Sequence, residues 1–164
     1  MNKKQEIAIF AGGCFWGVEE IFRKIPGVID TTVGYIGGST EHPKYKEVCT
    51  GKTGHAEALE IMFDPDKVSY ESLVHTFFKM HDPTTPNRQH NDIGTQYRSA
   101  IFADNEQQKE IARKVIAELT AKNEFKKPIV TQIENASMFY SAEEEHQDYL
   151  MKNPGGYNCH ILRP

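Results

Sequence analysis

The order of apolar patterns up to residue 103 constrains the fold of this chain more than any other feature. Short apolar or alternating runs predict β-strands, and apolar residues three or four positions apart predict helices. Strands are predicted at residues 7–11, 28–35, 55–63 and 96–103. The two helical stripes between them consist of Phe15, Val18, Phe22 and Ile25, and of Leu73, Val74, Phe77 and Phe78. The order strand–helix–strand–strand–helix–strand predicts an α+β, ferredoxin-like split βαβ fold, in which helices cover one face of an antiparallel-containing sheet.

The remaining residues predict additions to this two-layer sandwich. A capping box that begins at Asp104 predicts a third helix, and residues 129–133 form a short run typical of a strand. A second capping box, at Ser141, predicts a last helix that ends where the tail, residues 153–164, begins. Because a glycine pair precedes the tail cysteine, Cys159, we expect an extended tail that is mobile enough for this thiol to swing.

Length, charge and cysteine content exclude several classes of protein. A chain of 164 residues is long enough for one domain, so a single domain is expected over residues 1–164. A net charge of −4 without a Lys/Arg-rich run argues against nucleic acid as a partner. No apolar stretch approaches a membrane span, and the run at residues 7–11 is too short for a secretion signal. The three cysteines contain no Cys-x-x-Cys pair, which indicates catalytic thiols in a reducing, cytoplasmic setting rather than a metal site.

Cys14 lies where the first predicted strand passes through two glycines into the first helix. Free N–H groups and the helix dipole at this position favour an anion, and the thiolate is the reactive form of cysteine. The dipole contributes only about 0.3–2 kcal/mol, so it ionises the thiol only partly. Two interpretations stay open at this point: a nucleophile beside Phe15 and Trp16, the only tryptophan of the chain, or a small core residue.

Glu57 is the second candidate, because strand alternation places its carboxyl on the same face as Leu59 and Ile61. A carboxyl buried among apolar side chains stays protonated and can donate a proton. The alternative is an exposed carboxyl at the open end of the strand. Cys49 has no acid, base or aromatic pair beside it and is interpreted as a buried spectator.

Five motifs are spread over nearly the whole chain. They are Gly13-Cys14-Phe15-Trp16-Gly17, Gly54-His55-Ala56-Glu57, His81-Asp82-Pro83-Thr84, Gly94-Thr95-Gln96-Tyr97-Arg98-Ser99 and Asn153-Pro154-Gly155-Gly156-Tyr157-Asn158-Cys159. Together, in this order, they resemble those of the A-type peptide-methionine sulfoxide reductases. The resemblance implies reduction of the S epimer of methionine sulfoxide, free or within proteins, without a cofactor.

The resemblance also implies a role for each candidate at the reacting sulfoxide. By this analogy Cys14 attacks the sulfoxide sulfur and Glu57 protonates the departing oxygen. The hydroxyls of Tyr45 and Tyr97 hydrogen-bond the same oxygen. This scheme fits the residue types, because a neutral acid and hydroxyl donors stabilise charge that develops on oxygen.

The remaining implied roles concern substrate recognition and recycling. Phe15 and Trp16 would enclose the methyl group of the substrate, and Asp92 would shape the site through hydrogen bonds. Methionine leaves Cys14 as a sulfenic acid, which Cys159 resolves as a disulfide. A thioredoxin-like donor then restores both thiols by exchange. A monomer is the default expectation.

Two departures and two competing readings accompany the resemblance. His90 stands where glycine is expected, and the tail carries one cysteine where some relatives carry two, so a relay through a third thiol would need Cys49. A thiol hydrolase is the first alternative and requires His55 to contact Cys14. The second is a non-catalytic thiol module that binds a metal or senses redox state. Neither alternative explains Glu57 and the aromatic pair together.

Overall fold

The computed structural model describes residues 5–158 and 160–163 and confirms the split βαβ core. Its elements are β1 (Glu6–Gly12), α1 (Phe15–Phe22), β2 (Val28–Ile36), β3 (Ala56–Phe63), α3 (Tyr70–Met80) and β6 (Ser99–Ala103). These strands lie in the order β6-β1-β3-β2, and each neighbouring pair is antiparallel. This is the arrangement that the order of elements along the sequence predicts.

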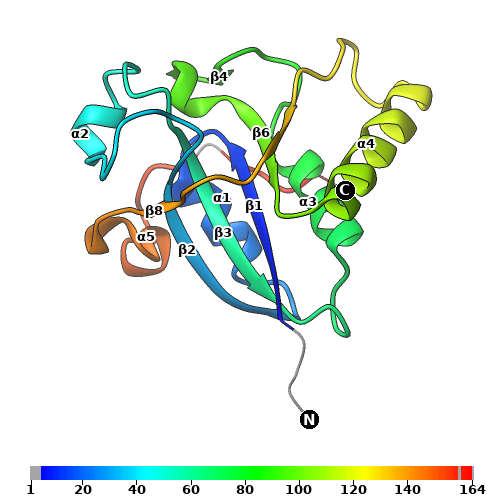
Figure 1. The fold of residues 1–164 in the computed structure, drawn as a ribbon, viewed down its shortest axis with the longest axis horizontal. Helices are drawn as coiled ribbons and strands as arrows, with labels where there is room; N and C mark the ends of the chain where they lie inside the picture. The colour runs from blue at the N-terminus through cyan, green and yellow to red at the C-terminus, as the bar shows by residue number, and fades with distance from the viewer. Residues whose placement is uncertain (1–4, 159, 164) are drawn as a thin grey trace.

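Shorter elements extend this core at both edges. They are α2 (Tyr45–Val48), β4 (Arg88–Gln89), β5 (Asp92–Ile93), η1 (Thr95–Tyr97), α4 (Glu106–Ala121), β7 (Gln132–Asn135), β8 (Tyr140–Ser141), η2 (Glu144–His146) and α5 (Tyr149–Lys152). Strand β7 pairs in parallel with β6, and β8 pairs antiparallel with β2, which gives the sheet order β7-β6-β1-β3-β2-β8 (Figure 1). Strands β4 and β5 form a separate pair.

The two faces of the sheet are covered differently. On one face Phe10 and Leu59 pack against helices α1 and α3, and the rings of Phe10 and Phe77 stack at 5.0 Å. On the other face Ala58 and Phe102 pack against Phe139, which lies in the segment between β7 and β8. Figure 1 shows this segment crossing the sheet in front of the strands, opposite α1 and α3. The two predicted layers are therefore present, and an extended segment covers the second face.

The predicted cap of the third helix is wrong by one residue. Helix α4 begins after Asn105, whose side chain accepts a hydrogen bond from the backbone N–H of Gln108 at 2.9 Å. The amide oxygen of Gln108 in turn accepts from the backbone N–H of Asp104 at 2.9 Å. Asp104 and Asn105 are both good capping residues, so composition alone does not decide between them.

The predicted C-terminal helix from Ser141 is also wrong. Ser141 lies in β8, opposite Gly34 of β2, and the following residues form the short helices η2 and α5. Between these two helices Asp148 has a left-handed backbone, with φ of 52°, which a continuous helix cannot contain. The predicted strand at residues 96–103 is shorter as well, because η1 occupies its start.

Within the described ranges, no helix is long and apolar enough to cross a membrane. The tail residues 157–158 and 160–163 have no regular secondary structure. The expected mobility of the tail stays a prediction. Cys159 lies outside the described residues.

Candidate active site

Cys14 lies at the turn between β1 and α1, as the sequence predicts. Gly13 makes the turn with φ of 95°, a conformation that residues with a Cβ rarely adopt, and Cys14 is the N-cap residue of α1. Only 8% of Cys14 is exposed. The start of the helix favours the thiolate form of this cysteine.

Glu57, in β3, is buried and contacts the residue that follows Cys14, so the exposed alternative is wrong. It is 1% exposed, and its Oε1 accepts a hydrogen bond from the backbone N–H of Phe15 at 3.2 Å. Its Oε2 has no hydrogen-bond partner among the described residues. Burial raises the pKa of Glu57 to about 8, the hydrogen bond from Phe15 opposes this shift, and the charge of Asp92 adds to it. The carboxyl is therefore mainly protonated at neutral pH, and Oε2 is the oxygen placed to carry the proton.

Two tyrosines lie near this carboxyl. Tyr45 is the first residue of α2 and Tyr97 is the last residue of η1, and both are half-buried. Burial raises the pKa of both hydroxyls, and the charge of Glu57 adds to the shift. Both tyrosines are therefore neutral hydrogen-bond donors over the physiological pH range.

The aromatic pair after Cys14 is packed among other rings. Phe15 is fully buried, and its ring lies 6.4 Å from that of Tyr45. Trp16 is half-buried and stacks on Tyr149 with ring centroids 3.8 Å apart. The indole N–H of Trp16 donates to Nδ1 of His146 at 3.0 Å. Trp16 is thus held at one edge by a hydrogen bond and on one face by a ring.

Asp92 links the site to the tail. It is the first residue of β5, and its Oδ2 accepts a hydrogen bond from the hydroxyl of Tyr157 at 3.1 Å. Tyr157 lies two positions before Cys159 in the sequence. Asp92 therefore connects β5 to the part of the tail that precedes Cys159 in the sequence.

A second contact of the tail explains the last glycine of the first motif. Nε2 of His160 donates to the carbonyl oxygen of Gly12 at 2.7 Å, because a carbonyl can only accept. A Cβ atom on Gly17 would lie 2.2 Å from Nδ1 of His160. Farther along, the guanidinium of Arg163 donates to backbone carbonyls at the C-terminal end of α3. His160 therefore lies against the start of α1, and Arg163 lies against the end of α3.

Glu143 and His146 belong to the site but are missed by sequence reasoning, which placed them in a helix. The two carboxylate oxygens of Glu143 accept from the hydroxyl of Tyr35 at 2.9 Å and from the backbone N–H of Tyr45 at 3.0 Å. Burial opposes ionisation, but these hydrogen bonds outweigh it and lower the pKa of Glu143. Glu143, Glu145 and His146 bring potential metal-ligand atoms within 4.8 Å of one another, yet the oxygens of Glu143 and Nδ1 of His146 already accept hydrogen bonds.

The remaining candidates do not support a hydrolase. Nδ1 of His55 accepts from the backbone N–H of Gly38 at 3.0 Å, and its Nε2 donates to the carbonyl of Thr40 at 2.6 Å. Both ring nitrogens are thus occupied, and His55 cannot serve as a base for Cys14 in this arrangement. The prediction that Cys49 is buried is wrong, because Cys49 is exposed at the end of α2. Its interpretation as a spectator stays a prediction.

Comparison with known proteins decides the family. A family model described as peptide methionine sulfoxide reductase matches residues 6–164. The chain belongs to this family. It is 54% identical over 155 residues to the peptide methionine sulfoxide reductase MsrA of Methanoculleus marisnigri, with 94% of each chain covered.

Solved structures agree with this membership. The crystal structure of Mxr1 from Saccharomyces cerevisiae in reduced form matches with a TM-score of 0.92 and 41% identity, over 98% of this chain and 93% of the yeast chain. Mxr1 in complex with Trx2 matches with a TM-score of 0.67 and 27% identity, over 100% of this chain and 94% of the yeast chain.

One departure from the family pattern has a structural explanation. His90, which stands where the resemblance leads us to expect glycine, lies in the turn between β4 and β5 with φ of 51°. This left-handed conformation favours glycine, although histidine adopts it more readily than most residues. The turn that precedes Asp92 therefore keeps a glycine-like backbone despite the substitution.

Proposed function

We propose that this reductase acts on the S epimer of methionine sulfoxide, free or within proteins, with Cys14 as the nucleophile and Glu57 as the acid. The state of the Glu57 carboxyl carries the proposal. It is buried, protonated at neutral pH and hydrogen-bonded to the N–H of Phe15, the residue directly after Cys14. An acid held this close to the nucleophile serves a reaction in which oxygen gains a proton while sulfur is attacked.

The chemical step follows from this placement. The sulfur of Cys14 attacks the sulfoxide sulfur, and the sulfoxide oxygen takes the proton of Glu57 as its negative charge develops. The hydroxyls of Tyr45 and Tyr97 donate to the same oxygen and stabilise that charge. Oxygen passes to Cys14, which becomes a sulfenic acid, and methionine leaves. The thiol proton of Cys14 replaces the proton that Glu57 gave, so one thiol and one sulfoxide yield one sulfenic acid and one thioether.

Substrate recognition relies on the apolar end of the sulfoxide. Phe15 and Trp16 enclose the methyl group, which has no polar atoms to hydrogen-bond. Asp92 keeps the oxygen side of the site in shape through its hydrogen bonds.

We propose that residues 1–164 form a single catalytic domain. Its tail, residues 153–164, returns the oxidised Cys14 to the thiol. The thiol of Cys159 attacks the sulfenic sulfur of Cys14, a disulfide forms and water leaves. A thioredoxin-like dithiol then reduces the disulfide by exchange. The complex of yeast Mxr1 with Trx2 supports this class of partner. All electrons come from thiols, so the scheme needs neither a metal nor an organic cofactor. We further propose that the enzyme is a monomer and that it works in the cytoplasm, where thiol donors are kept reduced.

The role of Glu57 is tested by single-turnover kinetics of Glu57→Gln. The amide oxygen can still accept the N–H of Phe15, but the variant has no acidic proton. Loss of general acid catalysis is expected to slow methionine formation roughly 100- to 10,000-fold, with little change in substrate affinity. Glu60→Gln, on the same strand, is the control and should react at the wild-type rate. An unchanged rate in Glu57→Gln would remove Glu57 from the chemistry.

A further inference from the structure

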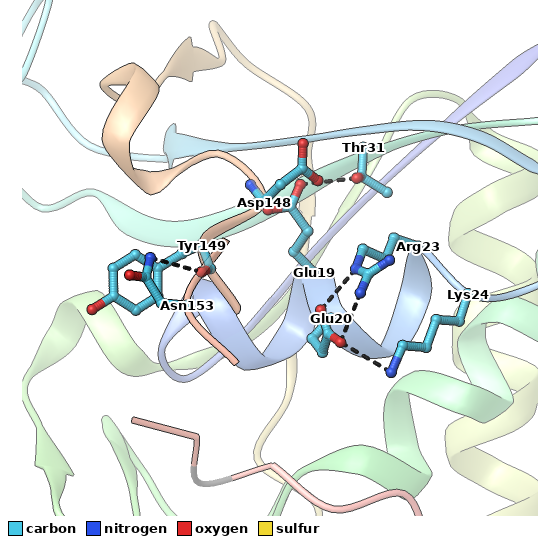
Figure 2. A network of polar contacts seen from close by, with 8 residues as sticks. All are labelled: Glu19, Glu20, Arg23, Lys24, Thr31, Asp148, Tyr149 and Asn153. Atoms are coloured by element: carbon cyan, nitrogen blue, oxygen red, sulfur yellow. Dashed lines mark hydrogen bonds and ion pairs between the residues drawn. The ribbon is translucent and has the colours of Figure 1, made fainter. Parts of the chain in front are cut away.

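Glu19 is a second buried carboxyl near the site, and the proposed reaction does not use it. It lies on α1, is 1% exposed, and accepts two hydrogen bonds. Its Oε2 accepts from the hydroxyl of Thr31 at 2.8 Å, and its Oε1 accepts from the backbone N–H of Asp148 at 2.7 Å. Figure 2 shows this carboxyl pointing from α1 toward both partners. Burial of a carboxyl costs folding free energy unless its oxygens are hydrogen-bonded. Here the two hydrogen bonds of Glu19 join α1 to β2 and to the start of α5.

The segment that Glu19 holds leads directly to the aromatic wall of the site. Asp148 is the N-cap residue of α5, with a left-handed backbone of φ 52° and ψ 37°. The next residue, Tyr149, stacks on Trp16 at 3.8 Å with 12° between the ring planes. Trp16 lies three positions before Glu19, so both side chains project from the same side of α1. Helix α1 therefore contacts both residues: Glu19 accepts a hydrogen bond from Asp148, and the ring of Trp16 stacks on Tyr149.

We propose that Glu19 is a positioning residue: by fixing the N–H of Asp148 it sets the start of α5, so that Tyr149 holds the Trp16 ring in its substrate-binding orientation. This inference rests on the proposed function, in which Trp16 encloses the substrate methyl group. Tyr149 supports one face of the indole, and the hydrogen bond to His146 already fixes its N–H edge. Loss of the Glu19 contact would leave the indole ring without its second support.

The test compares Glu19→Met with Glu19→Gln. Both side chains match glutamate in length, but only glutamine can accept from Asp148 and interact with the hydroxyl of Thr31. We expect Glu19→Met to raise KM for a methionine S-sulfoxide roughly tenfold, because binding of the substrate would then have to order the indole ring of Trp16. The rate of the first turnover at saturating substrate should stay within about twofold, because Cys14 and Glu57 are untouched. Glu19→Gln should restore the wild-type KM.

Fluorescence gives a readout that does not depend on activity. Trp16 is the only tryptophan, so its emission reports the stacked ring and the hydrogen bond directly. We expect a changed emission maximum and intensity in Glu19→Met and a wild-type spectrum in Glu19→Gln. Glu20→Ala is the matched control, because Glu20 lies on the same turn of α1 but pairs with Arg23 and Lys24 instead (Figure 2). It should change neither KM nor emission.

A double-mutant cycle with Tyr149→Leu tests the route of the effect. If Glu19 acts through Tyr149, each single variant raises KM and the double variant raises it little further. If Glu19→Met does not fold, Glu19→Asp replaces it, since its shorter side chain cannot span both partners. Wild-type KM and emission in the folded Glu19 variant, or additive effects in the cycle, would overturn the inference. Absence of sulfoxide reduction by the wild-type protein would instead overturn the proposed function, and Trp16 emission would still decide whether Glu19 positions the ring.

Discussion

Burial sets the charge states of individual residues at this site. Glu57 is kept protonated by desolvation, and Tyr45 and Tyr97 stay neutral for the same reason. Glu143, in contrast, is kept ionised by the donors around it. The oxygen of a sulfoxide would therefore meet three neutral donors, and the carboxylate of Glu143 is already occupied by hydrogen bonds from Tyr35 and Tyr45.

The raised pKa of Glu57 predicts how stability depends on pH. Folding shifts this pKa from about 4.5 to about 8, so the contribution of the neutral carboxyl is fully present below the unfolded pKa and is lost as pH rises through 8. Relative to Glu57→Gln, the wild-type protein should lose roughly 3 kcal/mol of unfolding free energy between pH 5.5 and 8.5, at about 1.36 kcal/mol per pKa unit.

Urea unfolding of both proteins at the two pH values measures this difference. Taking the difference between the two proteins cancels the contribution of Glu19, whose pKa burial also raises, to about 7. If the difference in unfolding free energy between the wild-type protein and Glu57→Gln is the same at both pH values, Glu57 is not a protonated, buried carboxyl.

At the residue scale the sequence is informative where a local pattern exists. The alternation of β3 places Glu57 on the buried face, and the glycines mark the turn before Cys14. No such pattern points to Glu143, because it meets Tyr35 across 108 positions of the chain. Only the folded arrangement shows that this carboxylate belongs to the site.

At the scale of single elements, the cap of α4 gives a test that distinguishes two adjacent residues. Asn105→Ala removes the side chain that accepts from Gln108 and should destabilise the protein by about 1 kcal/mol. Asp104→Ala should cost less than about 0.5 kcal/mol, because the backbone N–H of Asp104, not its side chain, makes the contact with Gln108. Equilibrium urea unfolding measures both changes in the free energy of unfolding. A larger loss of stability in Asp104→Ala than in Asn105→Ala would show that Asp104 is the cap, as the sequence predicts.

The misassigned C-terminal helix shows where element prediction fails. The capping box at Ser141 is a local signal, but pairing of β8 with β2 satisfies the same backbone groups through a distant strand. The left-handed Asp148 then separates η2 from α5, and the carboxylate of Glu19 accepts its N–H. Both competing interactions are tertiary, so a local reading of residues 140–152 has no access to them.

At the scale of the whole molecule, strand direction explains why the site forms. Because β1 runs antiparallel to β3 and β6, the end of β1 lies beside the starts of β3 and β6. Cys14 follows β1, Glu57 is the second residue of β3, and Tyr97 precedes β6. The predicted order of elements is sufficient for this convergence. It does not predict the segment that crosses the second face of the sheet, since that segment has neither helical nor strand periodicity.

The central claim is a thiol reaction that stops after one turnover without a reductant, and product stoichiometry tests it most directly. Reduced protein is mixed with a methionine S-sulfoxide, and methionine and cysteine oxidation states are quantified by mass spectrometry. We expect about one equivalent of methionine per protein and a new Cys14–Cys159 disulfide. Cys159→Ser should also give about one equivalent, with a sulfenic acid at Cys14 and no turnover with thioredoxin. Sulfoxide reduction at the wild-type rate by Cys14→Ser would contradict the account.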